Sequence, residues 1–150
     1  MTRRARLARI AMAALLLASA SASCAPARLI SDYDPGTDQA VTRFHRDLEG
    51  LLLSLEETAG TPDGAHAVYA EDYRQLRVGL RSLRLRAESR ERNELQVEQL
   101  DALEENLARL ERAHEEGLRA EEVELFRRGF HQQLRAILTL ELAKRRGEGP

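Results

Sequence analysis

The sequence predicts an all-α protein, a four-helix up-down bundle that follows an N-terminal export signal. Leu, Ala, Glu and Arg dominate the composition and only 4% of residues are aromatic, which favours long helices over sheets. From about residue 35, apolar residues recur every three or four positions in four separate stretches, as on one face of an α-helix. Short polar or glycine-rich links separate these stretches, and short links make consecutive helices antiparallel neighbours.

The first 23 residues are typical of a secretory signal peptide. Four arginines occur among residues 1–9, residues 10–17 are all apolar, and small residues continue to Ser23. The alternative is a membrane helix that stays attached, but a bilayer span takes about 20 apolar residues and this run is shorter. We therefore expect residues 1–23 to be removed on export.

Cys24 is the only cysteine of the chain and directly follows this cleavage zone. The run Ser21-Ala22-Ser23-Cys24 resembles a bacterial lipobox, although it has Ser21 where that motif prefers Leu. Standard signal-peptidase cleavage, after Ala20 or Ala22, is the alternative. An exported protein with one cysteine cannot form an internal disulfide, which favours a lipid on that thiol. We expect residues 24–34 to be the lipid anchor and tether.

A lipidated Cys24 would place the chain in the bacterial cell envelope. By resemblance to enterobacterial lipoproteins, Ala25 rather than Asp after the cysteine favours the periplasmic face of the outer membrane. From Cys24 onward 19 strong bases face 25 acids, a net charge of −6, because four of the 23 bases precede it. Such a charge gives no reason to bind nucleic acid. The expected partners are the membrane, through Cys24, and an unknown envelope protein.

Residues 35–146 are expected to form the bundle domain. Asp34 before Pro35 suggests an N-cap followed by proline at the first helical position. The first helix should end before the turn at residues 60–64, and the second should run from near Ala65 to residues 87–90. The predicted core includes Leu48, Leu76, Leu80, Leu103, Leu107 and Ile137.

The third and fourth helices are expected from Asn93 to Gly117 and from about Ala120 to Lys144. Asn93 and Gln96 have the spacing of a capping box. Leu142 continues the apolar stripe of the fourth helix, and Lys144 lies at the C-terminal end of that helix, where a positive charge interacts favourably with the helix dipole. A row of arginines on the second helix should face a row of acidic residues on the third. The arginine row consists of Arg74, Arg77, Arg81 and Arg84, and the acidic row consists of Glu94, Glu98, Asp101, Glu104 and Glu105.

No catalytic motif was found in the sequence, so we expect no enzymatic activity and no cofactor. The weak candidate for a metal site is Glu111-Arg-Ala-His114, which has the Glu-x-x-His spacing of ferritin-like di-metal bundles. Those sites need two such motifs, and this chain has one. His114 also continues a leucine stripe, so a histidine at the end of the core is the preferred interpretation.

Two alternatives to a simple binding or scaffold domain stay open. One is a metal-binding or redox bundle centred on Glu111 and His114. The other is a small-molecule sensor or carrier, with a cavity between the first and fourth helices lined by Phe44, Phe126 and Phe130. A calcium loop at residues 32–38 is a minor alternative, since it lacks the glycine and glutamate of an EF-hand.

Three segments carry a resemblance to a known family: residues 29–41, 99–107 and 140–147. They resemble the corresponding parts of small uncharacterised proteobacterial lipoproteins, and the likeness would cover nearly all of the chain after Cys24. The resemblance implies a lipid anchor and a helical domain, and it implies no activity. The leading hypothesis is therefore a membrane-anchored envelope lipoprotein with a non-enzymatic helical domain for binding or scaffolding.

Overall fold

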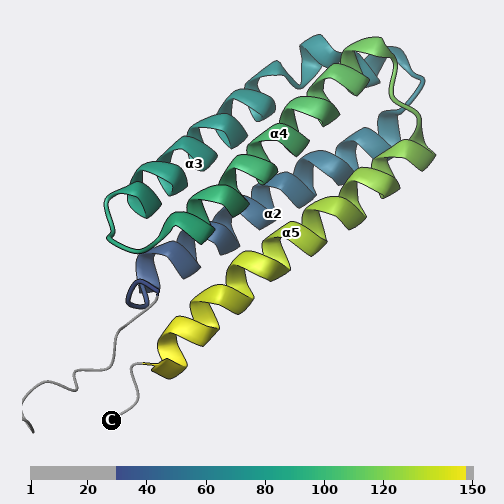
Figure 1. Cartoon of the computed structure of the whole chain (residues 1–150). Coiled ribbons are helices and arrows are strands. Elements are labelled where there is room, and N and C mark those ends of the chain that lie inside the picture. The colour runs from purple at the N-terminus through teal and green to yellow at the C-terminus, as the bar shows by residue number, and fades with distance from the viewer. Residues whose placement is uncertain (1–29, 148–150) are drawn as a thin grey trace, which may run out of the picture.

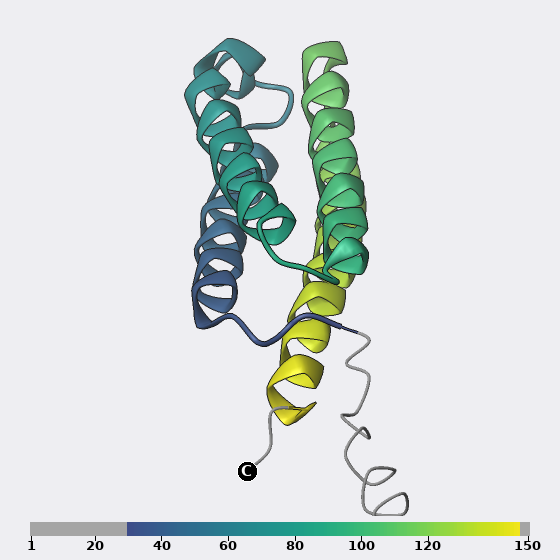
Figure 2. The ribbon, with the colours of Figure 1, turned by 60° about the vertical axis from the view of Figure 1, so that its left-hand side comes forward.

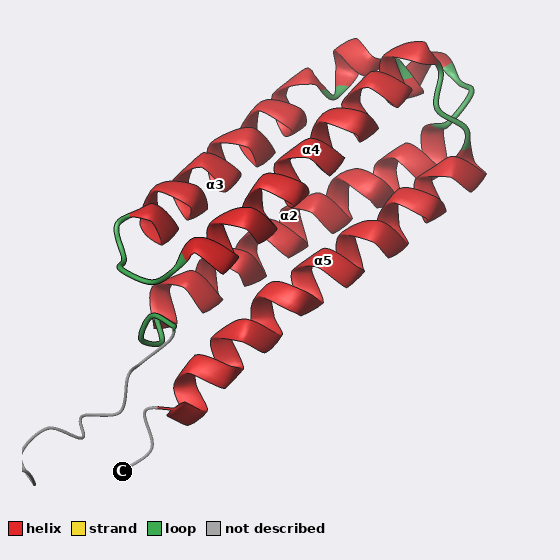
Figure 3. Cartoon of the chain, in the orientation of Figure 1, coloured by secondary structure: helices red, strands yellow, loops and turns green. Residues whose placement is uncertain are grey.

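A computed structural model describes residues 30–147, which contain helices and loops and no strand (Figure 3). The four long helices are α2 (Pro35–Thr58), α3 (Ala70–Glu88), α4 (Glu94–Glu116) and α5 (Ala120–Gly147). Two short 3₁₀ turns, η1 (Pro62–Gly64) and η2 (His66–Val68), lie between α2 and α3. The predicted breaks between the helices are confirmed.

The helices form a closed ring in which each contacts two neighbours: α2 packs against α3 and α5, and α4 packs against α3 and α5. Successive helices run in opposite directions, so residues 30 and 147 lie at the same end of the bundle (Figure 1). In the turned view, α2 with α3 and α4 with α5 form two antiparallel pairs (Figure 2). The predicted up-down four-helix bundle is confirmed.

One continuous core of buried apolar side chains fills the space between the four helices. All six leucine and isoleucine residues predicted to be buried are at most 3% exposed. Tyr73, Phe130 and Val123 add fully buried side chains from α3 and α5. Because burial of an aliphatic side chain is worth about 1.5–3 kcal/mol, this core is the main source of stability.

The caps of two helices follow the sequence rules. Asp34 is the N-cap of α2, where its carboxylate accepts a hydrogen bond from the backbone N–H of Gly36 at 3.0 Å. At the end of α4, Gly117 adopts a left-handed conformation with φ of 103°, and Leu118 after it is buried. Glycine is favoured there because it has no Cβ to oppose a positive φ.

The second helix begins at Ala70 and not near Ala65, so that boundary was wrong. The two 3₁₀ turns η1 and η2 occupy the chain between α2 and α3, and they fold back over the end of α2. A Cβ on Gly64 would lie 2.2 Å from the carbonyl oxygen of Thr58, so only glycine permits this close approach. The observed start lies next to Tyr69, the N-cap residue of α3.

The last turns of α5 differ from the sequence prediction. Leu142, expected on the buried stripe, is 51% exposed, whereas Glu141 and Lys144 are 1% and 3% exposed. The inward positions after Ile137 fall at residues 141 and 144 because they continue the three- and four-residue steps of the helix. Among residues 30–147, no helix has both the length and the hydropathy needed to cross a membrane.

Leu107→Ala tests the core directly. Leu107 is 1% exposed, so its truncation should lower the free energy of unfolding by about 2–5 kcal/mol. Urea unfolding followed by circular dichroism measures this change. Leu125→Ala on α5 is the matched control, because Leu125 is 60% exposed and its loss should cost about 0.5 kcal/mol or less. Equal effects of the two substitutions would contradict the packing described here.

Candidate functional site

His114 closes the core at the end of the bundle where the 3₁₀ turns lie. It is 6% exposed, its Nδ1 lies 3.0 Å from the Tyr73 hydroxyl oxygen, and its Nε2 lies 2.8 Å from the Gly64 carbonyl oxygen. A carbonyl oxygen only accepts hydrogen bonds, so Nε2 carries the hydrogen and donates it. In the neutral ring, Nδ1 then accepts from Tyr73. The preferred interpretation of His114 as a core-end histidine is confirmed.

Glu111, the other half of the Glu-x-x-His motif, is directed to a different partner. Its carboxylate oxygens accept hydrogen bonds from Nη1 of Arg77 on α3 at 2.6 and 2.5 Å. His66 Nε2 lies 3.5 Å from the same carboxylate. Burial, followed by the negative charge of Glu111, raises the pKa of Tyr73, so its hydroxyl stays protonated. The Glu111 and His114 side chains thus have separate structural partners.

Three arginines of the α3 row, Arg74, Arg77 and Arg84, pair with acidic residues, and Arg77 and Arg84 pair with residues of α4. Besides the Arg77–Glu111 pair, Arg84 donates a hydrogen bond to Asp101. Arg74 instead bonds Glu71 within α3, which holds the pKa of Glu71 at about 2. The charges therefore favour α4 as the neighbour of α3, although each exposed pair is worth only about 0–1 kcal/mol.

The opposite end of the bundle contains a buried ammonium group. Lys144 Nζ lies 2.6 Å from a Glu141 carboxylate oxygen, 2.7 Å from Asn93 Oδ1 and 2.7 Å from Gln96 Oε1. An ammonium group has three hydrogens to donate, and three acceptors receive them. The sequence analysis placed Lys144 at the C-terminal end of the helix and did not predict its burial. Asn93 and Gln96 do not form the expected capping box, because both side-chain oxygens are engaged by the lysine.

This Lys144 network extends to the segment that enters the bundle. Asn93 Oδ1 also accepts from the Ser31 hydroxyl at 2.8 Å, and its Nδ2 donates to the Ala87 carbonyl at 3.0 Å. The second carboxylate oxygen of Glu141 accepts from the backbone N–H of Asp34 at 3.3 Å. Residues 31–34 are thereby joined to α3, α4 and α5. We interpret the network as structural, because its charges face one another.

Asp34 has a second role beside its helix cap. Its carboxylate lies 3.0 Å from Arg86 Nη1 and 3.4 Å from Arg90 Nη2, and it accepts from the Thr37 hydroxyl at 2.9 Å. Burial alone would raise the pKa of Asp34, but these bonds and charges outweigh it and lower that pKa below its ordinary value. Asp34 belongs to residues 32–38, the alternative calcium loop, and its carboxylate is paired with protein groups.

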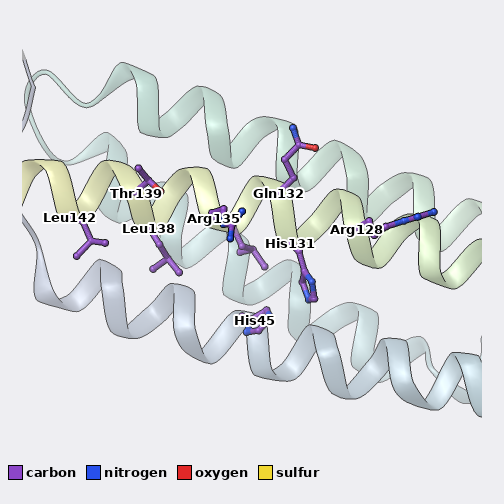
Figure 4. A pocket seen from close by; sticks show the side chains of 9 residues that line it. His45, Arg128, His131, Gln132, Arg135, Leu138, Thr139 and Leu142 are labelled. Carbon is purple, nitrogen blue, oxygen red and sulfur yellow. The ribbon is translucent and has the colours of Figure 1, made fainter.

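A groove lies along α5, and of its lining residues His131, Leu138 and Leu142 point toward α2 whereas Gln132 and Thr139 point away from it (Figure 4). Its volume is about 750 Å³, within the roughly 300–1,000 Å³ of typical small-molecule sites. Only His45 of its lining comes from α2, and the other lining residues belong to α5. Phe44, Phe126 and Phe130, expected to line a cavity between these helices, pack in or against the core instead. The lining is mixed, with apolar Leu134, Leu138 and Leu142, basic Arg128 and Arg135, and polar His45, His131, Gln132 and Thr139.

Two histidines and a glutamate meet at the α2 side of this groove. His45 and Glu49 lie one turn apart on α2, and His131 reaches them from α5. His131 Nε2 is 3.2 Å from Glu49 Oε2, and the two imidazole ring centroids are 5.4 Å apart. Sequence reasoning missed this group because it looked for Glu-x-x-His. The His-x-x-x-Glu spacing of His45 and Glu49 was the available signal.

Cys24, the expected lipid-attachment residue, lies outside the residues that the structure describes. No protein-family model, curated protein or solved structure matches the chain. Function therefore has to be argued from the residues themselves.

The Lys144 network yields a stability prediction. Lys144→Met removes the charge and leaves the Glu141 carboxylate buried without its cation, which should cost about 3–5 kcal/mol. Chemical unfolding measures the loss. The matched control is Arg146→Met, because Arg146 is an exposed cation two residues further along α5, where such a change should cost about 0.5 kcal/mol or less. A Lys144→Met protein as stable as the control would show that the ammonium is dispensable.

Proposed function

We propose that this protein is a lipid-anchored envelope protein whose four-helix domain is a non-enzymatic binding or scaffold module. The observation that carries the proposal is the position of the only cysteine, directly after an export signal and a run of small residues. Lipid chains would hold the domain at the membrane, at about 0.8 kcal/mol for each buried methylene group. The outer membrane remains the proposed location.

Binding is favoured over catalysis by where the reactive side chains lie. His114 and Lys144 are buried and bonded to their neighbours, so neither is available to a substrate. By contrast, the groove along α5 is open and lined by groups of several kinds. A scaffold role for an envelope protein would use the same exposed surface.

The groove's lining favours a small amphipathic anion as its ligand. Leu138 and Leu142 supply apolar surface, and Figure 4 shows both directed to the α2 side. Arg128 and Arg135 are exposed and form no ion pair with any residue between 30 and 147, so their charges are available to an anionic head group. This supports the sensor or carrier function as a second candidate, with a lining different from the three phenylalanines.

Cys24→Ser tests the anchor. In a bacterium that processes lipoproteins, the wild-type protein should incorporate labelled palmitate and sediment with membranes. The Cys24→Ser protein should incorporate none and appear in the soluble periplasmic fraction, with unchanged helical circular dichroism. Ser21→Leu is the matched control, because it brings the motif closer to a lipobox and should preserve labelling. A wild-type chain that begins at Ser21 or Ser23 without lipid would refute the anchor.

Titration with dodecyl phosphate tests the groove. Arg128→Glu/Arg135→Glu should weaken binding by about tenfold or more, because each tenfold corresponds to about 1.4 kcal/mol of lost interaction. Arg81→Glu is the matched control, since Arg81 is an exposed arginine on α3, outside the groove. Isothermal titration calorimetry gives the affinities. Equal affinities for the wild-type and groove-variant proteins would exclude this ligand class from the groove.

A further inference from the structure

We propose that His45, Glu49 and His131 form a binding site for a divalent transition-metal ion, which joins α2 to α5. One potential ligand atom from each of the three side chains can be chosen so that all lie within 4.8 Å of one another. Figure 4 shows His131 directed from α5 toward His45 on α2, whereas Arg128 extends away along the helix. The site is distinct from the Glu111–His114 motif and does not depend on the proposed lipid anchor.

The three side chains are close to the geometry that a metal requires. For tetrahedral zinc with bonds of about 2.0–2.1 Å, ligand atoms lie roughly 3.3 Å apart. His131 Nε2 and Glu49 Oε2 are already 3.2 Å apart. His45 lies on the same face of α2 as Glu49, one turn away, and one of its ring nitrogens lies within 4.8 Å of ligand atoms of the other two residues.

The donor set selects the class of metal. Imidazole nitrogens suit zinc, copper, nickel and cobalt, whereas magnesium and calcium prefer sites made of oxygen atoms alone. Two histidines and one carboxylate leave a fourth position of a tetrahedral ion for water or another ligand. His131 is 49% exposed and Glu49 is 29% exposed, so an ion can enter from solvent.

Charged groups of both signs surround the three side chains. Arg127 Nε lies 3.0 Å from Glu49 Oε1, on the carboxylate oxygen that does not face His131. The guanidinium also bonds Glu56 at 2.7 Å and Glu124 at 2.8 Å. In this cluster one positive charge faces three carboxylates, whereas Arg128 and Arg135, which line the same groove, add two positive charges nearby. Arg127 Nε contacts Glu49 as an ion pair without a hydrogen bond, and this contact leaves Oε2 on the side of His131.

Cobalt and zinc titrations test the site. The protein used is the full chain with Cys24→Ser and without a histidine tag, so that no thiol or added imidazole competes. Co²⁺ should bind with one-to-one stoichiometry and give the visible absorption bands of a cobalt ion with nitrogen and oxygen ligands, and Zn²⁺ should displace it. Zn²⁺ should also raise the midpoint of thermal unfolding, because it binds only the folded arrangement of α2 and α5.

Variants decide whether these residues are the ligands. His131→Ala and Glu49→Gln should each lower the Zn²⁺ affinity by about tenfold or more and abolish the thermal shift. His66→Ala is the matched control, because His66 also lies near carboxylates, Glu111 and Glu115, but at one end of the bundle. Unchanged affinity in both ligand variants, loss of binding in the control, or a wild-type dissociation constant weaker than about 1 mM would overturn the proposal.

Discussion

The buried charge of Lys144 is the constraint on which one whole end of the bundle depends. Removing an ammonium group from water costs several kcal/mol, so the fold must supply replacements for every lost water contact. Glu141 neutralises the charge, and Asn93 and Gln96 accept its other hydrogens. Because Asn93 also bonds Ser31 and the Ala87 carbonyl, the lysine indirectly fixes the α3–α4 link and the entering segment. A helix shifted by one turn would leave these groups buried and unpaired.

At each end of the core, a buried polar side chain forms a hydrogen bond with a segment that connects or precedes the helices. At one end His114 donates to the Gly64 carbonyl, and at the other Asn93, which accepts from Lys144, also accepts from Ser31 in the segment before α2. Leucine stripes alone allow helices to pack in more than one register, because successive turns of each helix present similar apolar side chains. Hydrogen bonds with a fixed partner penalise the other registers, because each leaves a buried polar group unsatisfied. The polar ends thus complement the apolar centre.

The sequence predicted the fold well because helix periodicity and turn residues are local signals. The stripes through Leu48, Leu80 and Leu107 and the break at Gly117 needed no knowledge of neighbouring helices. The Lys144 network was missed because a lysine near a helix end is ordinarily solvated, and two of its three acceptors, Asn93 and Gln96, lie far away in the sequence. His131 could not be grouped with His45 and Glu49 for a similar reason. Their meeting depends on the register of α2 against α5, which periodicity does not fix.

The burial of Lys144 also determines how the protein will respond to amine-directed chemistry. It is the only lysine of the chain, and its side chain is almost fully enclosed. Acylating reagents and lysine-directed crosslinkers therefore find no exposed lysine on the folded protein. Lys144 becomes reactive only when the last turns of α5 detach from Asn93 and Gln96. The rate of its modification, or of cleavage by a lysine-specific protease, would thus report local opening at this one end of the bundle.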